Sequence, residues 1–167
     1  MNKSTTTDPL LSEFADRFSP LEPENGLLKL IDKRTGATFC ECHIKASNLS
    51  ALATIDVPLD PDTQPEYRAN REIRLDHKAF IKMKDDAEKG RAFSNIVAEY
   101  TTAFNPTFPL KIVGGQHRFE AIQHALKNGI DEYHGIKVYF NLDKDQRMDV
   151  QLISNTTIAV SSALIDQ

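Results

Sequence analysis

The run PLKIVGGQHRFEAIQHALKNG, residues 109–129, constrains the fold of this chain more than any other stretch. Its first part, Leu110–Val113, is a short apolar run that predicts a buried strand. The apolar residues that follow recur at helical spacing: Phe119, Ile122, Ala125 and Leu126. Gly129 stands where a left-handed residue ends many helices. The chain therefore passes from a strand into a helix through two adjacent glycines, Gly114 and Gly115.

The segments that precede this run predict a hairpin and a helical region. LLKLIDKRTGATFCECHIKA indicates two strands around a turn at Thr35 and Gly36. VPLDPDTQP contains three prolines and predicts a loop. From Leu75 to Tyr100 the apolar residues favour two helices, or one helix broken at EKGR, and the second apolar stripe consists of Phe93, Ile96, Val97 and Tyr100.

The segments that follow predict a strand and a final helix. HGIKVYF places Ile136, Val138 and Phe140 on one face of a strand. In NLDKDQRMDVQLISN, Asp143 and Gln146 have the spacing of a capping box at a helix start. We expect residues 1–25 to be a loosely attached arm with a short helix around PLLSEFADRF, and residues 26–167 to be a single domain excised from a longer protein.

Composition restricts the class of protein. The chain has 167 residues, 40% of them hydrophobic and 26% charged, which is typical of a globular domain. No apolar run reaches the roughly 18 residues of a membrane span, and MNKSTTTDPLLSEFADRF lacks the features of a secretory signal. We therefore expect a cytoplasmic protein without membrane contact. Cys40 and Cys42 lie two residues apart in a predicted strand, which favours two buried reduced thiols over a disulfide or metal site.

The charge distribution gives little general affinity for a polyanion. The formal net charge is −4. One locally basic stretch, residues 66–91, precedes the glycine turn and reads either as a solvated helix face or as a source of arginines for a phosphate. Phe104 and Phe108 could stack on a base, although buried packing explains them more simply.

The glycine turn has the chemistry of an anion site. A strand that leads through glycines into a helix start presents free N–H groups and the positive end of the helix dipole. Arg118 has a planar guanidinium that fits phosphate oxygens, and His117 can donate to a phosphate, orient a water molecule or act as an acid or base. Gln116 can donate or accept. The alternative is a glycine needed only for packing and a solvated first helical turn.

The sequence IVGGQHRFEAI resembles the DGQHR signature of the ParB/sulfiredoxin-like superfamily, and the order strand, G-x-x-R, helix, strand, helix matches from about Leu110 to Ser162. LDKDQRMDVQLISNTT and, more weakly, YRANREIR resemble further family segments. The resemblance implies an α+β, ParB/sulfiredoxin-like fold: a small mixed sheet flanked by helices, here with an N-terminal hairpin extension.

The same resemblance implies a nucleotide site. Family members hold nucleotide phosphates at the G-x-x-R turn. The implied binding residues are Gly114, Gly115, Gln116, Arg118, Asn155, Thr156, Arg71 and Arg68. The implied catalytic residues are His117, Arg118 and Gln116. The implied cofactor is a nucleoside triphosphate, ATP or CTP, which can bring Mg²⁺, and no residue is assigned as a metal ligand.

Three departures from the family pattern limit the expected activity. Gly114 replaces the leading aspartate of the signature, so any role of that carboxylate is missing or supplied elsewhere. Gln116 stands where sulfiredoxins need a cysteine, which argues against sulfinic-acid reductase chemistry. Ile158 stands where ParB proteins have an arginine, which argues against a ParB-type CTP clamp.

Three functions remain from the sequence. The first is a nucleotide-binding domain, with slow nucleoside triphosphatase activity as an option, in a DNA-associated or phage-defence protein. The second is a DNA nuclease that uses the same turn, and the third is a non-catalytic regulatory or interaction domain. Partners are a nucleotide and, through the full-length protein, DNA; a homo-oligomer is compatible with the sequence.

Overall fold

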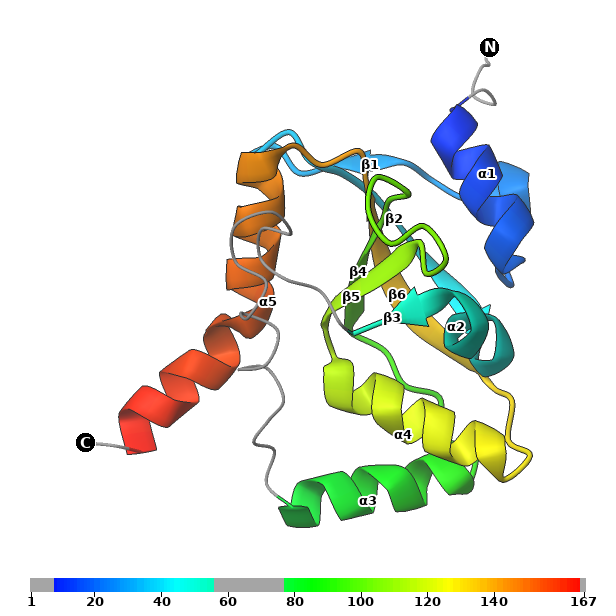
Figure 1. The fold of residues 1–167 in the computed structure, drawn as a ribbon, viewed down its shortest axis with the longest axis vertical. Coiled ribbons are helices and arrows are strands. Elements are labelled where there is room, and N and C mark those ends of the chain that lie inside the picture. The colour runs from blue at the N-terminus through cyan, green and yellow to red at the C-terminus, as the bar shows by residue number, and fades with distance from the viewer. Residues whose placement is uncertain (1–7, 56–76, 166–167) are drawn as a thin grey trace.

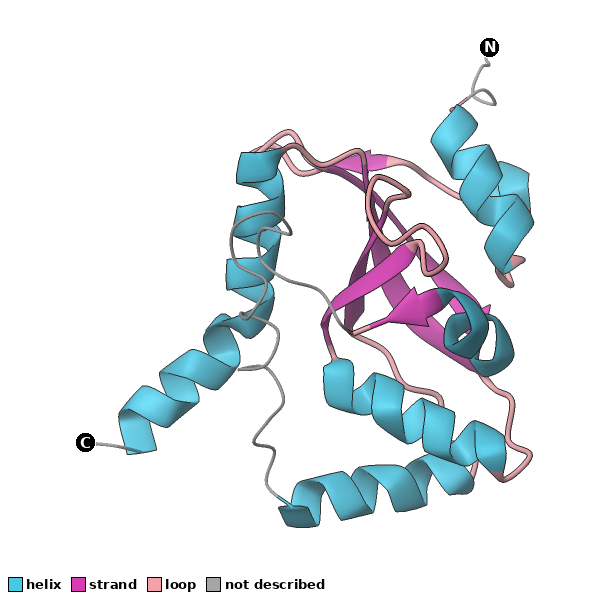
Figure 2. Ribbon diagram, viewed as in Figure 1, coloured by secondary structure: helices cyan, strands magenta, loops and turns pink. Residues whose placement is uncertain are grey.

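A mixed sheet forms the centre of the molecule, and helices lie on both of its faces. The computed structural model describes residues 8–55 and 77–165, with the side chains of the last helix described as far as Ser154. Within these ranges the fold is α+β, with one six-stranded sheet and five α-helices (Figures 1 and 2).

The sheet has the strand order β1-β2-β6-β4-β5-β3. Its strands are β1 (Leu30–Ile31), β2 (Thr38–Lys45), β3 (Ala53–Thr54), β4 (Ile96–Tyr100), β5 (Leu110–Gly114) and β6 (Tyr133–Phe140). β4 runs parallel to β6, and β3 runs parallel to β5, whereas the other neighbours are antiparallel. The end of β5 therefore lies beside the start of β4.

The five helices divide between the two faces of the sheet. They are α1 (Pro9–Phe18), α2 (Ala46–Leu52), α3 (His77–Glu88), α4 (Gln116–Lys127) and α5 (Lys144–Ile165), and a short 3₁₀ turn spans Glu24–Gly26. The main core contains buried apolar residues of α1, α2, α3 and α4 together with one face of the sheet. A smaller core on the other face includes Val113, Tyr139 and Val150, and α5 covers it (Figure 1).

The N-terminal segment is part of the main core from Pro9 onward. Asp8 caps α1 by accepting hydrogen bonds from the N–H groups of Leu10 and Leu11. Phe14 and Phe18 are fully buried, and Phe14 packs against the rings of the central strands. The expected short helix is present, but it is docked on the sheet and is not a loosely attached arm. The hairpin after it is also present, with Gly36 in the left-handed region at its turn.

The prediction of a second helix before Tyr100 was wrong. α3 ends at Glu88, Gly90 follows with a φ of 89°, and residues 96–100 form β4. Ile96, Ala98 and Tyr100 alternate into the main core, so their spacing also fits a strand. The β-branched Ile96 and Val97 favour that strand.

The elements around the glycine turn match their predictions. β5, α4 and β6 lie where the apolar patterns place them, and Gly129 follows α4 with a φ of 88°. Asp143 and Gln146 form the capping box: the N–H of Gln146 donates to Asp143 Oδ1 at 2.8 Å, and the N–H of Asp143 donates to Gln146 Oε1 at 2.9 Å. The proline-rich loop VPLDPDTQP, residues 57–65, lies entirely outside the described residues.

Candidate functional site

The fold itself accounts for both glycines of the turn. Gly115 precedes α4 with a φ of 84°, a conformation that side-chain-bearing residues rarely adopt. A Cβ at Gly115 would lie 3.2 Å from the Cα of Ile96, and a Cβ at Gly114 would lie 3.1 Å from the Cβ of Ser154 on α5 and 3.3 Å from the Cβ of Val97. The two glycines therefore let the end of β5 and the turn lie close to β4 and α5. This packing requirement holds whether or not a ligand binds.

Gln116 holds the turn together from inside. Its side chain is buried, and Nε2 donates to the carbonyl oxygen of Val113 at 3.0 Å. This bond ties the first residue of α4 back to β5. The amide nitrogen that the sequence offered to a phosphate is therefore engaged within the protein.

His117 and Arg118 are half-buried and follow Gln116 in the first turn of α4. The imidazole of His117 lies edge-on to the ring of Phe80 on α3, with 5.7 Å between the ring centroids. Burial lowers the pKa of His117 below its usual value near 6.5, while the nearby Glu120 carboxylate acts in the opposite direction. His117 is therefore a neutral imidazole at neutral pH.

The guanidinium of Arg118 has no acceptor among the described side chains. Across residues 8–55 and 78–154, no hydrogen bond or ion pair engages it. A half-buried guanidinium without a protein acceptor retains its capacity for bidentate contact with a carboxylate or a phosphate.

The first N–H groups of α4 are also free of protein acceptors. Phe119 is the first residue whose N–H closes the helical pattern, by donating to the carbonyl of Gly115 at 3.0 Å. The N–H groups of Gln116, His117 and Arg118 have no acceptor within the described part of the chain. These donors and the helix dipole give the start of α4 a partial positive charge.

α3 packs beside α4 in a parallel orientation, because Phe80 contacts His117 in the first turns of the two helices and Glu88 pairs with His124 further along (Figure 1). Lys84 lies over the Phe80 ring, with its Nζ 4.8 Å from the centroid. Lys84 therefore lies against the ring that contacts His117.

Four predicted binding residues have no described side chain. Arg68 and Arg71 lie outside the described residues, and Asn155 and Thr156 belong to the part of α5 that is described by its backbone. Ser154, the residue before Asn155, lies against Gly114. The backbone of α5 therefore passes close to Gly114. Sequence reasoning missed the contacts of Ser154 and Phe80, because neither residue type signals a site.

The two phenylalanines considered for base stacking lie away from the turn. Phe104 and Phe108 belong to the loop between β4 and β5, which enters β5 at the end opposite to Gly114. The ring centroid of Phe104 lies 4.8 Å from Nζ of Lys111, and the guanidinium of Arg147 also faces this ring. Both rings are half-buried, in agreement with a packing role.

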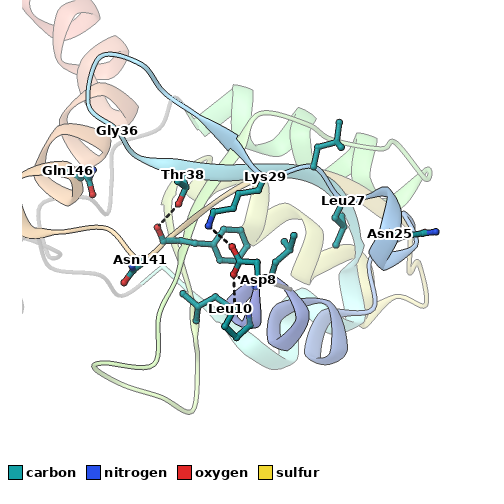
Figure 3. Close-up of a pocket in the computed structure, with 13 residues that line it drawn as sticks. Asp8, Leu10, Asn25, Leu27, Lys29, Gly36, Thr38, Asn141 and Gln146 are labelled. Atoms are coloured by element: carbon teal, nitrogen blue, oxygen red, sulfur yellow. Dashed lines mark hydrogen bonds and ion pairs between the residues drawn. The ribbon is translucent and has the colours of Figure 1, made fainter. Parts of the chain in front are cut away.

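A pocket also lies at the other end of the sheet. It has a volume of about 900 Å³ and is lined by the starts of α1, β2 and α5 and the end of β6 (Figure 3). Several of its polar side chains are engaged: Asp8 caps α1 and pairs with Lys29, and Thr38 Oγ1 donates to the carbonyl of Phe140 at 3.2 Å. None of the predicted site residues lines this pocket. A second pocket, of about 470 Å³, adjoins the turn through Asn95 and Val97.

The two cysteines are free and buried, as expected. Contact with Cys40, together with burial, raises the pKa of the Cys42 thiol. No group of three or more His, Cys, Asp or Glu side chains that could hold a metal ion occurs among the described residues.

Comparison with known proteins gives no assignment: no family model, no curated protein and no solved structure matches this chain. Within the described ranges, no helix is long and apolar enough to cross a membrane.

Proposed function

We propose that this chain is a nucleotide-binding domain that holds the phosphates of a nucleoside triphosphate at the start of α4. The observation that carries the proposal is the free Arg118 guanidinium beside three N–H groups that have no acceptor in the described chain. Helix starts of this kind bind phosphate through their N–H groups and their dipole. Lys84 supplies a further cation beside Phe80, the ring that contacts His117.

The proposal assigns different roles to the members of the turn. Arg118 and the N–H groups contact phosphate oxygens, while Gly115 and Gln116 shape the turn. His117, as a neutral imidazole, can donate one hydrogen bond to a phosphate oxygen or orient a water molecule for slow hydrolysis. Any Mg²⁺ would arrive with the nucleotide.

The fold supports this proposal without identifying the family. The order β5, glycine turn, α4, β6, α5 agrees with the order expected from the resemblance to the ParB/sulfiredoxin-like superfamily. We propose the DGQHR type of that fold, acting in a DNA-associated or phage-defence protein, with the missing aspartate at Gly114 as its main departure.

A fluorescent-nucleotide titration tests the proposal. The wild type should bind ATP or CTP, and Arg118→Ala should weaken binding about 10- to 100-fold, because a hydrogen bond to a charged group contributes about 1.5–3 kcal/mol. Arg91→Ala is the matched control, since Arg91 is exposed and pairs with Asp86 on α3. The control should bind as the wild type does.

The outcomes separate the candidate functions. Absence of nucleotide binding by the wild type would refute the proposal. Binding with release of inorganic phosphate that depends on His117 would indicate a triphosphatase, whereas binding without hydrolysis would indicate a regulatory domain. Cleavage of supercoiled plasmid that depends on His117 and added Mg²⁺ or Mn²⁺ would favour a nuclease.

A further inference from the structure

The second pocket lies on the open part of the sheet face that α5 covers elsewhere. It is formed by β2, β6 and the start of β4, and its volume of about 470 Å³ lies within the range of small-molecule sites. Its lining includes the polar side chains of Glu41, His43, Asn95 and Lys137. Glu41, His43 and Asn95 are exposed.

This pocket shares two residues with the walls of the glycine turn. Val97 lines the pocket, and its Cβ lies 3.3 Å from the position of a Cβ at Gly114. Asn95 also lines the pocket, and its carbonyl oxygen lies 3.4 Å from the position of a Cβ at Gly115. The pocket therefore adjoins the turn, with the side chain of Val97 and the backbone of Asn95 between them.

Glu41 is the carboxylate of this pocket. No hydrogen bond or ion pair engages it among the side chains described in residues 8–55 and 78–154. Lys137 stands directly opposite Glu41 in the β2–β6 register, but its ammonium lies over the Phe39 ring, 4.2 Å from the centroid. His43 is engaged with Glu22 at 2.7 Å. Glu41 thus keeps its capacity to accept hydrogen bonds from a ligand.

The larger pocket at the other end of the sheet differs in this respect. There the side chains of Asp8, Lys29, Thr38 and Gln146 are bonded to other parts of the protein. The smaller pocket therefore combines a carboxylate that has no partner among the described side chains with a position next to the proposed phosphate site.

We infer that the pocket between Glu41 and Asn95 receives the nucleoside half of the nucleotide, with Glu41 accepting hydrogen bonds from its sugar hydroxyls or from an exocyclic amino group. This inference rests on the proposed function, because it requires the phosphates at the start of α4. Both donor groups offer the same chemistry to a carboxylate. Glu41 is then a binding residue that determines preference for a nucleoside over a bare polyphosphate.

Binding of ATP and of inorganic tripolyphosphate to wild type and Glu41→Gln tests the inference. ATP should bind the wild type at least about 10-fold more tightly than tripolyphosphate, and Glu41→Gln should reduce that preference by about 10-fold while leaving tripolyphosphate affinity unchanged or higher. Asp16→Asn is the matched control, because it removes one charge from an exposed position on α1. A general charge effect would strengthen anion binding in both variants, whereas loss of a hydrogen bond weakens ATP binding only in Glu41→Gln.

Two analogues identify the group that faces Glu41. If the sugar faces Glu41, 2′-deoxy-ATP should bind the wild type more weakly than ATP, and Glu41→Gln should lose this difference. If the amino group faces Glu41, inosine triphosphate should bind the wild type more weakly than ATP, and Glu41→Gln should again lose the difference. Equal binding of ATP and tripolyphosphate by the wild type, or an unaltered preference in Glu41→Gln, would overturn the inference and leave the proposed function intact. Failure of both ligands to bind would overturn both.

Discussion

The two ends of β5 use basic side chains in opposite ways. At the start of the strand, Lys111 is fully buried, and its ammonium donates to the carbonyl oxygens of the loop that connects β4 to β5. The acceptors belong to Thr101, Phe104, Asn105 and Phe108, at 3.2, 2.7, 2.9 and 2.6 Å. Beyond the end of the strand, Arg118 is half-buried and has no acceptor in the described chain.

The comparison teaches which cation belongs to the fold and which is available for a ligand. A buried charge is tolerated when hydrogen bonds replace its lost hydration. Lys111 meets this condition because its ammonium donates to backbone carbonyl oxygens of residues 101–108. These hydrogen bonds fix the conformation of the loop. Arg118 contributes no such contact within the described residues, and its donors remain available to a bound anion.

Two histidines show the same difference. His134 is buried, its Nδ1 accepts the N–H of Phe93 at 2.9 Å, and its ring stacks on Phe93. His117 contacts the ring of Phe80 and is only half-buried. His134 therefore stabilises the segment at Phe93 that leads into β4. His117 is the histidine next to the turn and is accessible to a ligand there.

The largest effect on stability should come from Lys111→Met. This change keeps the apolar stem but removes the donor for four carbonyl oxygens, so we expect a loss of about 3 kcal/mol in the free energy of unfolding. Urea denaturation followed by circular dichroism measures it, since the chain has no tryptophan. Lys137→Met is the control and should cost less than about 1 kcal/mol, because its ammonium only lies over aromatic rings. Equal effects of the two changes would contradict the structural role of Lys111.

The next effect concerns the acid sensitivity that His134 confers. Burial lowers the pKa of His134 to about 4, from the ordinary value near 6.5, although Asp131 acts in the opposite direction. Between these two pKa values the unfolded chain binds a proton at this position and the folded chain does not. Stability should therefore fall as the pH decreases from about 6.5 to 4, by up to about 3 kcal/mol.

Replacement by asparagine isolates this effect from the carboxylates that titrate in the same range. The side-chain oxygen of His134→Asn can still accept the N–H of Phe93, but the residue no longer titrates. The difference in unfolding free energy between wild type and variant should change by about 2 kcal/mol or more between pH 6.5 and pH 4.5. A difference that is constant with pH would show that His134 titrates alike in both states.

Much of the fold could be predicted from local sequence patterns. The apolar spacing of α4, the alternation in β6 and the Asp143–Gln146 capping box each depend on residues close together in the chain. The segment Phe93–Tyr100 was assigned wrongly because its apolar residues fit both helical and strand spacing, and only pairing with β5 and β6 decides between them. α2 and β3 were not predicted, since their short lengths leave little periodic signal.

The glycine turn was predictable in its location, but its internal contacts were not. The sequence predicts an anion-binding turn at Gly114–Arg118, and Arg118 has no acceptor among the described side chains. The engagement of Gln116 with Val113 was not predictable, because a backbone carbonyl carries no sequence signature. The role that we infer for Glu41 was not predictable for a similar reason: Glu41 lies more than seventy residues before the turn, and only the neighbouring strands bring it near Asn95.

The smallest effect on stability is expected for Arg118→Ala, and it sharpens the comparison with Lys111 most directly. A side chain that makes no polar contact in the described chain should change the free energy of unfolding by no more than about 0.5 kcal/mol in the absence of ligand. With saturating nucleotide, the wild type should gain stability by linkage, about 2.7 kcal/mol at a hundredfold excess over Kd, and the variant should gain clearly less at the same nucleotide concentration. Thermal unfolding with and without nucleotide measures both terms. If Arg118→Ala destabilised the free protein as much as Lys111→Met does, both cations would serve the fold, and the functional distinction between the two ends of β5 would fail.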